Sequence, residues 1–384
     1  MIPHFSGKLQ EGSKRMRVAF VSFEFIEYSV RLASGIAQDA SVLLLLPDNE
    51  VRPYMYLVKH GVEIRPFHKP RLRQPLRQAK MIGHLVRLIR DFKPDVIHLQ
   101  SGHPWFSLAL SMLGNIPLVV TVHDPSRHFG GSSCVLVDWA LDHPCHRARQ
   151  RIVHAPQMKD LLVKRFGVSS DSVHIVPHIM IGDDSVLERV PEDENLILFF
   201  GRIQEYKGLE YLIRAEPLIA AKVPAATFVI AGTGEDFGRY RQMMVHPERF
   251  IVYNEHVSDL KRAELFRRAS IVVLPYVEAS QSGVIPIAYR FGKAVVVTNV
   301  GGLPAMVDHG QTGYIVPPCD TSALAEAIIL LLENKELRSQ LGLNGKRKVN
   351  TEFSAERVAG KTLEVYQLAI QEGSQAKCQK AITQ

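Results

Sequence analysis

The stretch LILFFGRIQEYKG, residues 196–208, decides the fold class of this chain. It opens with five consecutive apolar residues, which is typical of a parallel β-strand that is buried on both faces. A loop bounded by Gly201 and Gly208 follows, and a helical period begins directly after it. A strand, a loop and a helix in this order are the repeating unit of α/β folds with parallel sheets.

Short apolar runs of this kind alternate with amphipathic stretches along the whole sequence. Helices are expected at residues 209–221, 259–269 and 321–333, the last of which follows the N-capping residue Asp320. Strands are expected at residues 17–22, 40–46, 96–99, 118–122, 152–154, 174–176, 196–200, 227–231, 251–253, 271–274, 294–298 and 313–316. The sequence therefore predicts an α/β protein with helices on both faces of its parallel sheets.

So many strands exceed one ordinary doubly wound sheet, so we expect a division of the chain. The stretch IMIGDDSVLERVPEDEN, residues 179–195, is acidic and rich in turn residues, and it lies directly before a strand. It predicts two Rossmann-like doubly wound domains, an acceptor-side domain at residues 1–185 and a donor domain at 186–384, with the last helix packing back on the first. Ligands of open α/β sheets bind beyond the carboxyl ends of the strands, so domains that face one another would hold the site in a cleft.

Composition excludes several classes of protein. The chain has 384 residues, 46% hydrophobic and 22% charged, which indicates a globular protein rather than a disordered one. Its four cysteines are too few for a disulfide scaffold. No apolar run approaches the ~18–20 residues of a membrane span, and residues 1–17 lack the apolar core of a secretory signal. We expect a cytoplasmic protein, either free or peripheral on the inner face of a membrane.

Two cations stand in the loop after the strand at 196–200. Arg202 offers a planar fork for phosphoryl oxygens, and Lys207 offers a compact point charge. Such a pair at the carboxyl end of a parallel strand suits a diphosphate. From spacing alone, a solvated basic loop is an equally good interpretation.

Three further loops follow predicted strands in the second half. Glycines at 232 and 234 would let a ligand approach the backbone. Free amides near Ser282 and Gly283 would face an anion at the start of a helix. The sequence NVGGLP, residues 299–304, forms another flexible turn. Together the loops predict a nucleotide-diphosphate pocket. Its candidate residues are Gly201, Gly232, Gly234, Ser280, Gln281, Ser282, Gly283 and Val284.

The order FFGRIQEYKG, VIAGTGE and then the segment 269–318 resembles the family 4 retaining glycosyltransferases of the GT-B fold. The similarity runs from about residue 196 to about 352, and VVTVHD (119–124) and IVPH (175–178) extend it more loosely into the first half. The resemblance implies transfer of a hexosyl-type sugar from a nucleoside-diphosphate donor to an acceptor hydroxyl, with retention and without a metal ion or other cofactor. It implies that Arg202 and Lys207 stabilise the departing diphosphate. Backbone near His256 and Val257 would contact the base.

The sequence departs from the family pattern in the third loop. The family usually carries E-x-x-G-x-x-x-x-E there, and an alignment through Gly292 places Ala279 and Ile287 at the two glutamate positions. The family glycine falls on Ser282. We expect Glu278, one residue away, to contact the donor sugar instead, although an ordinary exposed acid is the alternative. Ile287 cannot hydrogen-bond a ribose, so other groups must hold the nucleoside.

In the first half, His123 follows the strand at 118–122. The resemblance implies that it contacts the donor sugar, whereas a structural histidine is the alternative. Weaker candidates for the acceptor side are His98, Gln100 and His103, on or after the neighbouring strand. Glu24 is a further weak candidate, since it stands where the family often carries glycines.

The segment DHPCH, residues 142–146, raises a metal site as an alternative. Structural zinc needs paired short spacings, and no second pair is present, so we expect a helix end or an acceptor-side loop there and no metal.

Positive charge is concentrated at residues 59–93, which carry ten of the Lys and Arg residues against Glu63 and Asp91, in a chain of net charge +7. Apolar residues at helical spacing in this segment are Leu72, Leu76, Ala79, Ile82, Gly83 and Val86. A helix of this kind can lie on an anionic membrane, where each cation contributes ~1 kcal/mol. A core-packed helix with a solvated basic face is the alternative. Nucleic acid is not expected, because few aromatic residues lie between the cations.

Two other functions are compatible with such a sugar-nucleotide pocket. One is a GT-B-fold sugar-nucleotide epimerase, although the G-R-x-x-x-x-K-G element favours transfer. The other is a degenerate, non-catalytic sugar-nucleotide-binding protein, because both family glutamates are replaced.

Overall fold

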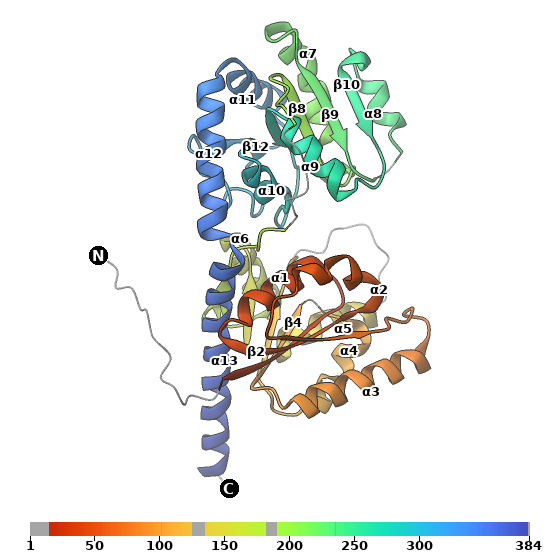
Figure 1. Cartoon of the computed structure of the whole chain (residues 1–384), viewed down its shortest axis with the longest axis vertical. Coiled ribbons are helices and arrows are strands. Elements are labelled where there is room, and N and C mark those ends of the chain that lie inside the picture. Colours follow the sequence, from red (N-terminus) through yellow and green to blue (C-terminus); the bar gives the residue numbers. More distant parts are fainter. Residues whose placement is uncertain (1–14, 101, 125–134, 182–189, 235, 383–384) are drawn as a thin grey trace, which may run out of the picture. The chain divides into compact units, whose positions relative to one another are not determined.

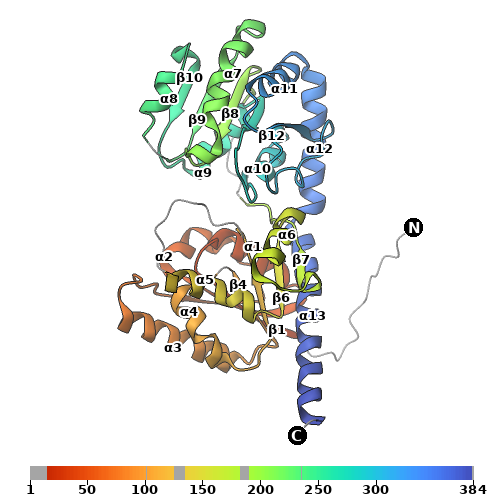
Figure 2. The same ribbon diagram turned by 180° about the vertical axis from the view of Figure 1, so that it is seen from behind.

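The computed structural model describes residues 15–100, 102–124, 135–181, 190–234 and 236–382. Within these residues the strands form one seven-stranded and one six-stranded sheet (Figures 1 and 2), which confirms the prediction of two Rossmann-like doubly wound folds. The chain divides into two compact units. The first comprises Met1–Thr121, Ser133–Gln150 and Thr362–Gln384, and the second comprises Val122–Ser132 and Arg151–Lys361. The boundary predicted between residues 185 and 186 lies outside the described residues.

The first sheet has the strand order β3-β2-β1-β4-β5-β6-β7. Its strands are β1 (Met16–Ser22), β2 (Ala40–Pro47), β3 (Val62–Phe67), β4 (Val96–Gln100), β5 (Leu118–Thr121), β6 (Gln150–Val153) and β7 (Val173–Ile175). The helices of this part are α1 (Ile26–Ile36), α2 (Asp48–Val51), α3 (Pro75–Phe92), α4 (Pro104–Leu108), α5 (Val135–Arg147) and α6 (Pro156–Phe166). Figure 1 shows α1 and α3 on opposite sides of the sheet, so the central strand β1 is covered on both faces. The strand order reverses between β1 and β4.

Strand β3 is absent from the sequence-based prediction. It lies at the edge of the sheet and reads VEIRPF, with Glu63, Arg65 and Pro66 exposed. An edge strand is paired on one side only, so it tolerates the charges and the proline that exclude it from an apolar strand pattern.

Helix α3 packs a different face from the one that the sequence predicts. Its buried residues are Gln78, Met81, Ile82, Leu85, Val86 and Ile89. Leu76 is 86% exposed and Leu72, before the helix, is 50% exposed, whereas the prediction places both on the apolar face. The helix therefore packs one face in the core and presents a basic outer surface, and association of that surface with a membrane stays a prediction.

The second sheet has the strand order β10-β9-β8-β11-β12-β13. Its strands are β8 (Leu196–Phe200), β9 (Thr227–Ala231), β10 (Phe250–Tyr253), β11 (Ile271–Leu274), β12 (Ala294–Thr298) and β13 (Gly313–Val316). The helices are α7 (Leu209–Lys222), α8 (Gly238–Met243), α9 (Asp259–Arg268), α10 (Val284–Arg290), α11 (Thr321–Glu333), α12 (Lys335–Glu352) and α13 (Ala355–Ile382). The order reverses between β8 and β11.

Alternate residues of β8 enter two separate apolar cores. Ile197 and Phe199 pack with residues of α7 and α11, whereas Leu196 and Leu198 pack with residues of α9 and α10. This is why the strand reads as a continuous apolar run: both faces of the sheet are covered by helices.

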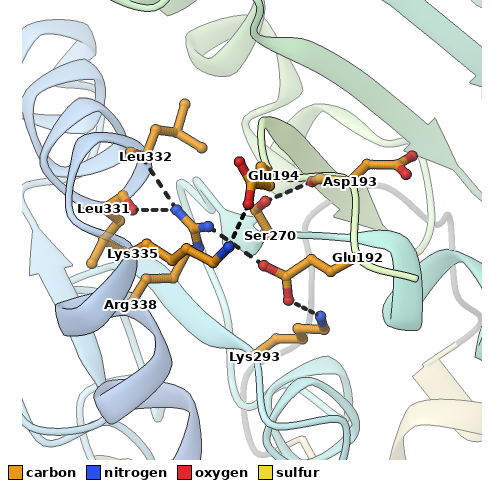
Figure 3. A network of polar contacts seen from close by, with 9 residues as sticks. All are labelled: Glu192, Asp193, Glu194, Ser270, Lys293, Leu331, Leu332, Lys335 and Arg338. Carbon is orange, nitrogen blue, oxygen red and sulfur yellow. Dashed lines mark hydrogen bonds and ion pairs between the residues drawn. The ribbon is translucent and has the colours of Figure 1, made fainter. Parts of the chain in front are cut away.

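The acidic stretch before β8 is clamped by ion pairs of the second unit (Figure 3). Glu192 contacts the ammonium of Lys293 and lies 3.5 Å from the guanidinium of Arg338. The guanidinium of Arg338 also donates to the carbonyl oxygen of Leu331 at the end of α11, 2.8 Å away. Burial lowers the pKa of Lys293, and the bond to Glu192 opposes that shift. The acidic composition therefore anchors this segment to the second unit.

Helix α13 contributes its C-terminal part to the first unit. The ring of Tyr366 is fully buried, and its hydroxyl lies 2.6 Å from Nδ1 of His98 on β4. Among the described residues, no helix is both long and apolar enough to cross a bilayer.

Candidate functional site

The loops after β8 and β11 flank the point at which the strand order of the second sheet reverses. Open α/β sheets bind ligands at this position, beyond the carboxyl ends of the strands. Arg202 and Lys207 lie in the loop after β8, and Glu278 to Gly283 lie in the loop after β11. The topology therefore brings two of the predicted loops to one edge of the sheet.

The side chain of Lys207 lies on an aromatic ring. Its ammonium is 3.6 Å from the centroid of Tyr276 and 5.0 Å from that of Tyr206. Burial and, to a smaller extent, the neighbouring charge of Arg202 lower the pKa of Lys207 to about 7. Because burial disfavours the charged ammonium, an anion bound beside Lys207 would stabilise its protonated form.

Backbone contacts hold the loop of Lys207 against the loop after β11. The amide of Val277 donates to the carbonyl oxygen of Tyr206 at 2.9 Å. Gly208 has a φ of 63°, and a Cβ there would lie 1.9 Å from the carbonyl oxygen of Pro275. Only glycine allows this approach, so Gly208 positions Lys207 beside Tyr276.

Gly201, Gly232 and Gly234 have a structural role that sequence reasoning missed. A Cβ on Gly232 would lie 1.9 Å from the carbonyl oxygen of Gly201, and one on Gly234 would lie 1.8 Å from that of Ile203. The amide of Gly201 donates to Ala231 at 2.9 Å. Gly232 and Gly234 thus permit close contact with the neighbouring loop, and the approach of a ligand to their backbone stays a prediction.

Glu278, in the loop after β11, lies in a different environment from Ala279 and Ile287, the two positions at which the family carries glutamate. Glu278 is exposed and lines a cavity of about 310 Å³ together with Ser280 and Gly301. Ala279 and Ile287 are buried in the apolar core of the second unit. A glutamate at either buried position would lose its hydration, so the carboxylate of this loop lies at 278.

One amide at the start of α10 is bonded within its own loop, whereas the anion contacts of the Ser282 and Gly283 amides stay a prediction. The hydroxyl of Ser282 accepts from the amide of Val284 at 3.2 Å, and it lies 3.4 Å from the hydroxyl of Tyr276. The Val284 amide is therefore engaged within the loop, which argues against a donor contact there. Gly283 precedes the helix with an ordinary φ of −69°.

His123 lies in a cluster of three buried histidines in the second unit. Its Nδ1 is 3.2 Å from Nε2 of His154 and 3.3 Å from the amide nitrogen of Gln281. Nδ1 of His154 donates to the carbonyl oxygen of Val176 at 2.8 Å, and the ring of His178 lies 5.8 Å from that of His123. Burial lowers the pKa of His178 to about 4, so this ring stays neutral at physiological pH.

These bonds assign the proton of His123. When the ring of His154 is neutral, its donation from Nδ1 to a carbonyl leaves Nε2 as an acceptor. His123 must then carry its proton on Nδ1, which leaves the lone pair on Nε2. The Gln281 amide then turns its oxygen, not its nitrogen, toward that proton. Asp124, the next residue, accepts a hydrogen bond from the hydroxyl of Ser280.

The other predicted site residues are spread over two regions. His256 is exposed and Val257 half-buried in the loop before α9. In the first unit, Glu24 is exposed after β1, and Gln100 is buried at the end of β4.

His98 and His103 differ in what they can offer an acceptor. His98 is buried, with Nε2 2.8 Å from the Thr121 hydroxyl and Nδ1 on Tyr366, so its position supports a core role rather than an acceptor contact. Nδ1 of His103 accepts from the Phe106 amide at 3.3 Å. Nε2 of His103 is buried and has no partner among the described residues.

Sequence reasoning missed Tyr276, His154 and His178 as parts of this site. Tyr276 stands two positions after β11, His154 follows β6 directly, and His178 lies close to the end of β7. A polar residue at the carboxyl end of each parallel strand was the signal that could have found them.

The described residues contain no cluster of three or more His, Cys, Asp or Glu side chains that could hold a metal ion. The segment 142–146 lies in the last turns of α5, so it forms a helix end, one of the two structures expected for it.

Comparison with known proteins assigns the family. Residues 194–334 match a family model described as "Glycosyl transferases group 1", and residues 28–179 match one described as "Glycosyltransferase Family 4". The two matches do not overlap and together span most of the chain. The protein belongs to the group 1, family 4 glycosyltransferases, and its activity is that of a glycosyltransferase.

Three similar proteins illustrate the relationship. A glycogen synthase of Mycobacterium tuberculosis is 26% identical over 303 residues, covering 72% of this chain and 69% of the relative. A D-inositol 3-phosphate glycosyltransferase of Paenarthrobacter aurescens is 27% identical over 335 residues, covering 78% and 81%. HepE of Anabaena, solved in complex with UDP, is 17% identical and has a TM-score of 0.69, covering 91% of this chain and 99% of its own. The last comparison shows a shared GT-B fold.

Proposed function

We propose that this glycosyltransferase moves a hexosyl-type sugar from a nucleoside-diphosphate donor to an acceptor hydroxyl, with retention of the anomeric configuration. The observation that carries the proposal is the placement of Lys207 and Arg202 at the reversal point of the second sheet, with the Lys207 ammonium on the ring of Tyr276. The UDP bound to HepE is consistent with a nucleoside diphosphate at a site of this fold.

In the proposed reaction, the bond between the anomeric carbon and the diphosphate oxygen breaks. The acceptor hydroxyl oxygen bonds to the same face of that carbon, and its proton passes to a phosphate oxygen of the leaving group. Negative charge grows on the diphosphate as it leaves. Fixed cations aimed at this charge stabilise the transition state more than the ground state, which is how Lys207 and Arg202 would accelerate transfer.

The proposal assigns the sugar to His123 and Glu278. The lone pair on Nε2 of His123 would accept a bond from a sugar hydroxyl, and the carboxylate of Glu278 would accept another. Two protein cations supply the positive charge, so the proposal includes neither a metal ion nor another cofactor. Glu24 and His103 of the first unit stay the candidates for the acceptor.

Substitution of the two cations tests this assignment. Lys207→Ala and Arg202→Ala should each lower the transfer rate roughly 10²- to 10³-fold, which is typical for the loss of one preorganised charge contact. Lys222→Ala, an exposed lysine at the end of α7, is the matched control and should keep the parental rate. Unchanged rates in both active-site variants would remove the assignment.

A panel of nucleoside-diphosphate sugars, with and without acceptor, separates the proposed function from its two rivals. Nucleotide release that requires an acceptor supports transfer. Conversion of the donor without an acceptor supports an epimerase. Tight binding with no turnover of any donor supports a degenerate protein.

We also propose that the first unit associates with an anionic membrane surface. Leu72 and Leu76 are exposed beside the cations Arg71, Arg73 and Arg77. Vesicles that contain 30% anionic lipid should pellet the protein at low salt, and Leu72→Ser/Leu76→Ser should reduce the bound fraction several-fold. Equal pelleting by neutral vesicles, or none at low salt, would contradict the proposal.

A further inference from the structure

A second cavity lies in the first unit, where β3 ends. Its volume is about 410 Å³. One wall is formed by residues of the segment 66–70, which contains the last residues of β3, and the other wall is formed by α3. Nothing described so far uses this cavity.

The α3 wall presents one helix face to the cavity. Its lining residues are Arg77, Lys80, Met81 and His84, which are spaced by three, four and seven positions and therefore lie on one face. Met81 is 6% exposed and forms the apolar floor, whereas Arg77 and Lys80 are exposed to solvent. The helix thus combines an apolar floor with a cationic rim.

Contacts on both sides hold the opposite wall in place. The side-chain nitrogen Nε2 of Gln78 donates to the carbonyl oxygen of Pro70 at 2.9 Å. The ammonium of Lys69 donates to the carbonyl oxygen of Phe23 at 2.7 Å and pairs with Glu50 at 3.2 Å. The cavity is therefore framed by a segment that is tied to α3 at one end and to the loop after β1 at the other.

The charges of the residues that line the cavity indicate the chemical class of its ligand. Arg77, Lys80, His68 and His84 all face this space, and among the described residues no carboxylate lines it. Guanidinium and ammonium groups recognise phosphoryl oxygens, the first through its planar fork and the second as a point charge. Phe67 and Met81 add apolar surface beneath the charges.

The position of the cavity relates it to the acceptor. Parallel α/β sheets bind ligands beyond the carboxyl ends of their strands, and β3 ends in this cavity. The ring of Phe67 lies 5.4 Å from that of Phe23, which follows β1 at the reversal point of the first sheet. We propose that the cavity binds the phosphoryl group of a phosphate-bearing acceptor. This inference rests on the proposed transferase function and adds the chemical class of its second substrate.

Calorimetric titration of the full chain tests the cavity by itself. The parent for this experiment is Arg202→Ala/Lys207→Ala, which removes the proposed donor diphosphate site. Addition of Arg77→Gln/Lys80→Gln should weaken binding of inorganic pyrophosphate at least tenfold. The control, Arg73→Gln/Arg87→Gln, removes the same charge from exposed positions outside the cavity and should stay within twofold of the parent. An equal loss in both variants, or no pyrophosphate binding by the parent at low salt, would overturn the proposal.

Two further probes identify the source of the phosphate. Geranyl phosphate that binds more tightly than pyrophosphate, with geraniol failing to bind, would indicate an acceptor with an apolar chain. Equal affinity for geranyl phosphate and pyrophosphate would indicate a small phosphorylated acceptor. Either result requires that Arg77→Gln/Lys80→Gln weakens binding of the probe while Arg73→Gln/Arg87→Gln does not. Tight binding of geraniol alone would contradict a phosphoryl site.

Donor measurements separate a failure of this inference from a failure of the proposed function. With the native Arg202 and Lys207, the Arg77→Gln/Lys80→Gln protein should bind and slowly hydrolyse a donor at the parental rate, while the KM for a phosphorylated acceptor rises at least tenfold. If the KM for the phosphorylated acceptor stays at the parental value, the cavity does not bind the acceptor, and the transferase proposal is unaffected. Absence of donor hydrolysis and transfer in every variant would exclude the transferase proposal, and the pyrophosphate titration would still decide the cavity.

Discussion

Lys207 shows how a residue's environment sets its chemistry. Its sequence context gives a basic loop, in which a lysine would stay charged at any physiological pH. Burial against Tyr276 and the charge of Arg202 bring its pKa to about 7, so the charged and neutral forms coexist there. The protonated form is the one that a diphosphate binds.

The pKa of Lys207 predicts a pH dependence of donor binding. A bound diphosphate favours the ammonium and raises its pKa, so binding takes up a proton once the free lysine is neutral. Affinity for a nucleoside-diphosphate sugar, whose phosphates do not titrate near neutrality, should be flat below about pH 7. Above that pH it should fall by up to about tenfold per pH unit. Calorimetry at pH 6 to 9 measures the slope. Lys207→Arg keeps its charge and should show none, so equal slopes in both proteins would contradict the assignment.

His154 should act on the proposed sugar site through His123. His154→Phe preserves the ring volume but removes one of the two acceptors for Nδ1–H of His123 and leaves only the Gln281 oxygen, so the tautomer with its proton on Nε2 becomes more populated. We expect kcat/KM for transfer to fall roughly 10- to 100-fold, as for other residues that set a histidine tautomer or orient a functional side chain. Affinity for the nucleoside diphosphate should stay unchanged, because the substitution leaves Lys207 and Arg202, its proposed contacts, in place. A parallel loss of both quantities would indicate general damage to the fold.

At the scale of elements, the apolar strands and long helices follow from the sequence, and three kinds of feature do not. Edge strand β3 is polar because only one of its sides is paired. The packed face of α3 includes Gln78, a polar residue that a hydrophobic pattern does not detect. It is buried, and its side-chain nitrogen Nε2 donates to the carbonyl oxygen of Pro70. Gly232 and Gly234 permit contact between loops, which a single strand-and-turn motif cannot reveal.

The clamp on the acidic stretch before β8 predicts an asymmetric response to substitution. Lys293 is 6% exposed, so Glu192→Gln leaves a buried ammonium without its charged partner. The free energy of unfolding of the second unit should fall by about 1–3 kcal/mol. Glu192→Gln/Lys293→Met removes both charges and should restore most of that loss. Thermal unfolding measures the effects.

The pair of Glu194 and Lys335 is the control for this clamp. Both side chains are more than 60% exposed, at 63% and 62%. Glu194→Gln should therefore leave stability nearly unchanged, because solvent screens an exposed ion pair. A loss equal to that of Glu192→Gln would mean that burial does not decide the strength of these pairs.

At the scale of the molecule, the chain starts in the first unit, builds the second and returns to the first through α13. Tyr366 and His98 meet in the first unit although 268 positions separate them in the chain. Burial lowers the pKa of His98 to about 3, so this ring takes part as a neutral group. Helix α13 thus contributes to the core of the unit in which the chain begins.

This return predicts that the C-terminal helix stabilises the first unit. Tyr366→Phe removes the hydroxyl partner of a buried imidazole and should lower the free energy of unfolding by about 1–2 kcal/mol. Glu364→Gln, at an exposed position of the same helix, should have a much smaller effect. Denaturant titration followed by hydrogen exchange of β4 amides measures both. Faster exchange confined to the second unit would contradict the prediction.

The sequence by itself determined the α/β class, the two Rossmann-like folds, nearly all the strands and the loop that carries Arg202 and Lys207. It could do so because these features are local: strand periodicity, helix caps and short motifs are written within a few residues of one another. Only the tertiary structure decided that Lys207 lies on Tyr276, that His154 fixes the proton of His123, and that α3 and the end of β3 enclose a cationic cavity. Each of these joins side chains from separate elements, and their burial, which sets charge and tautomer, exists only once the elements are packed.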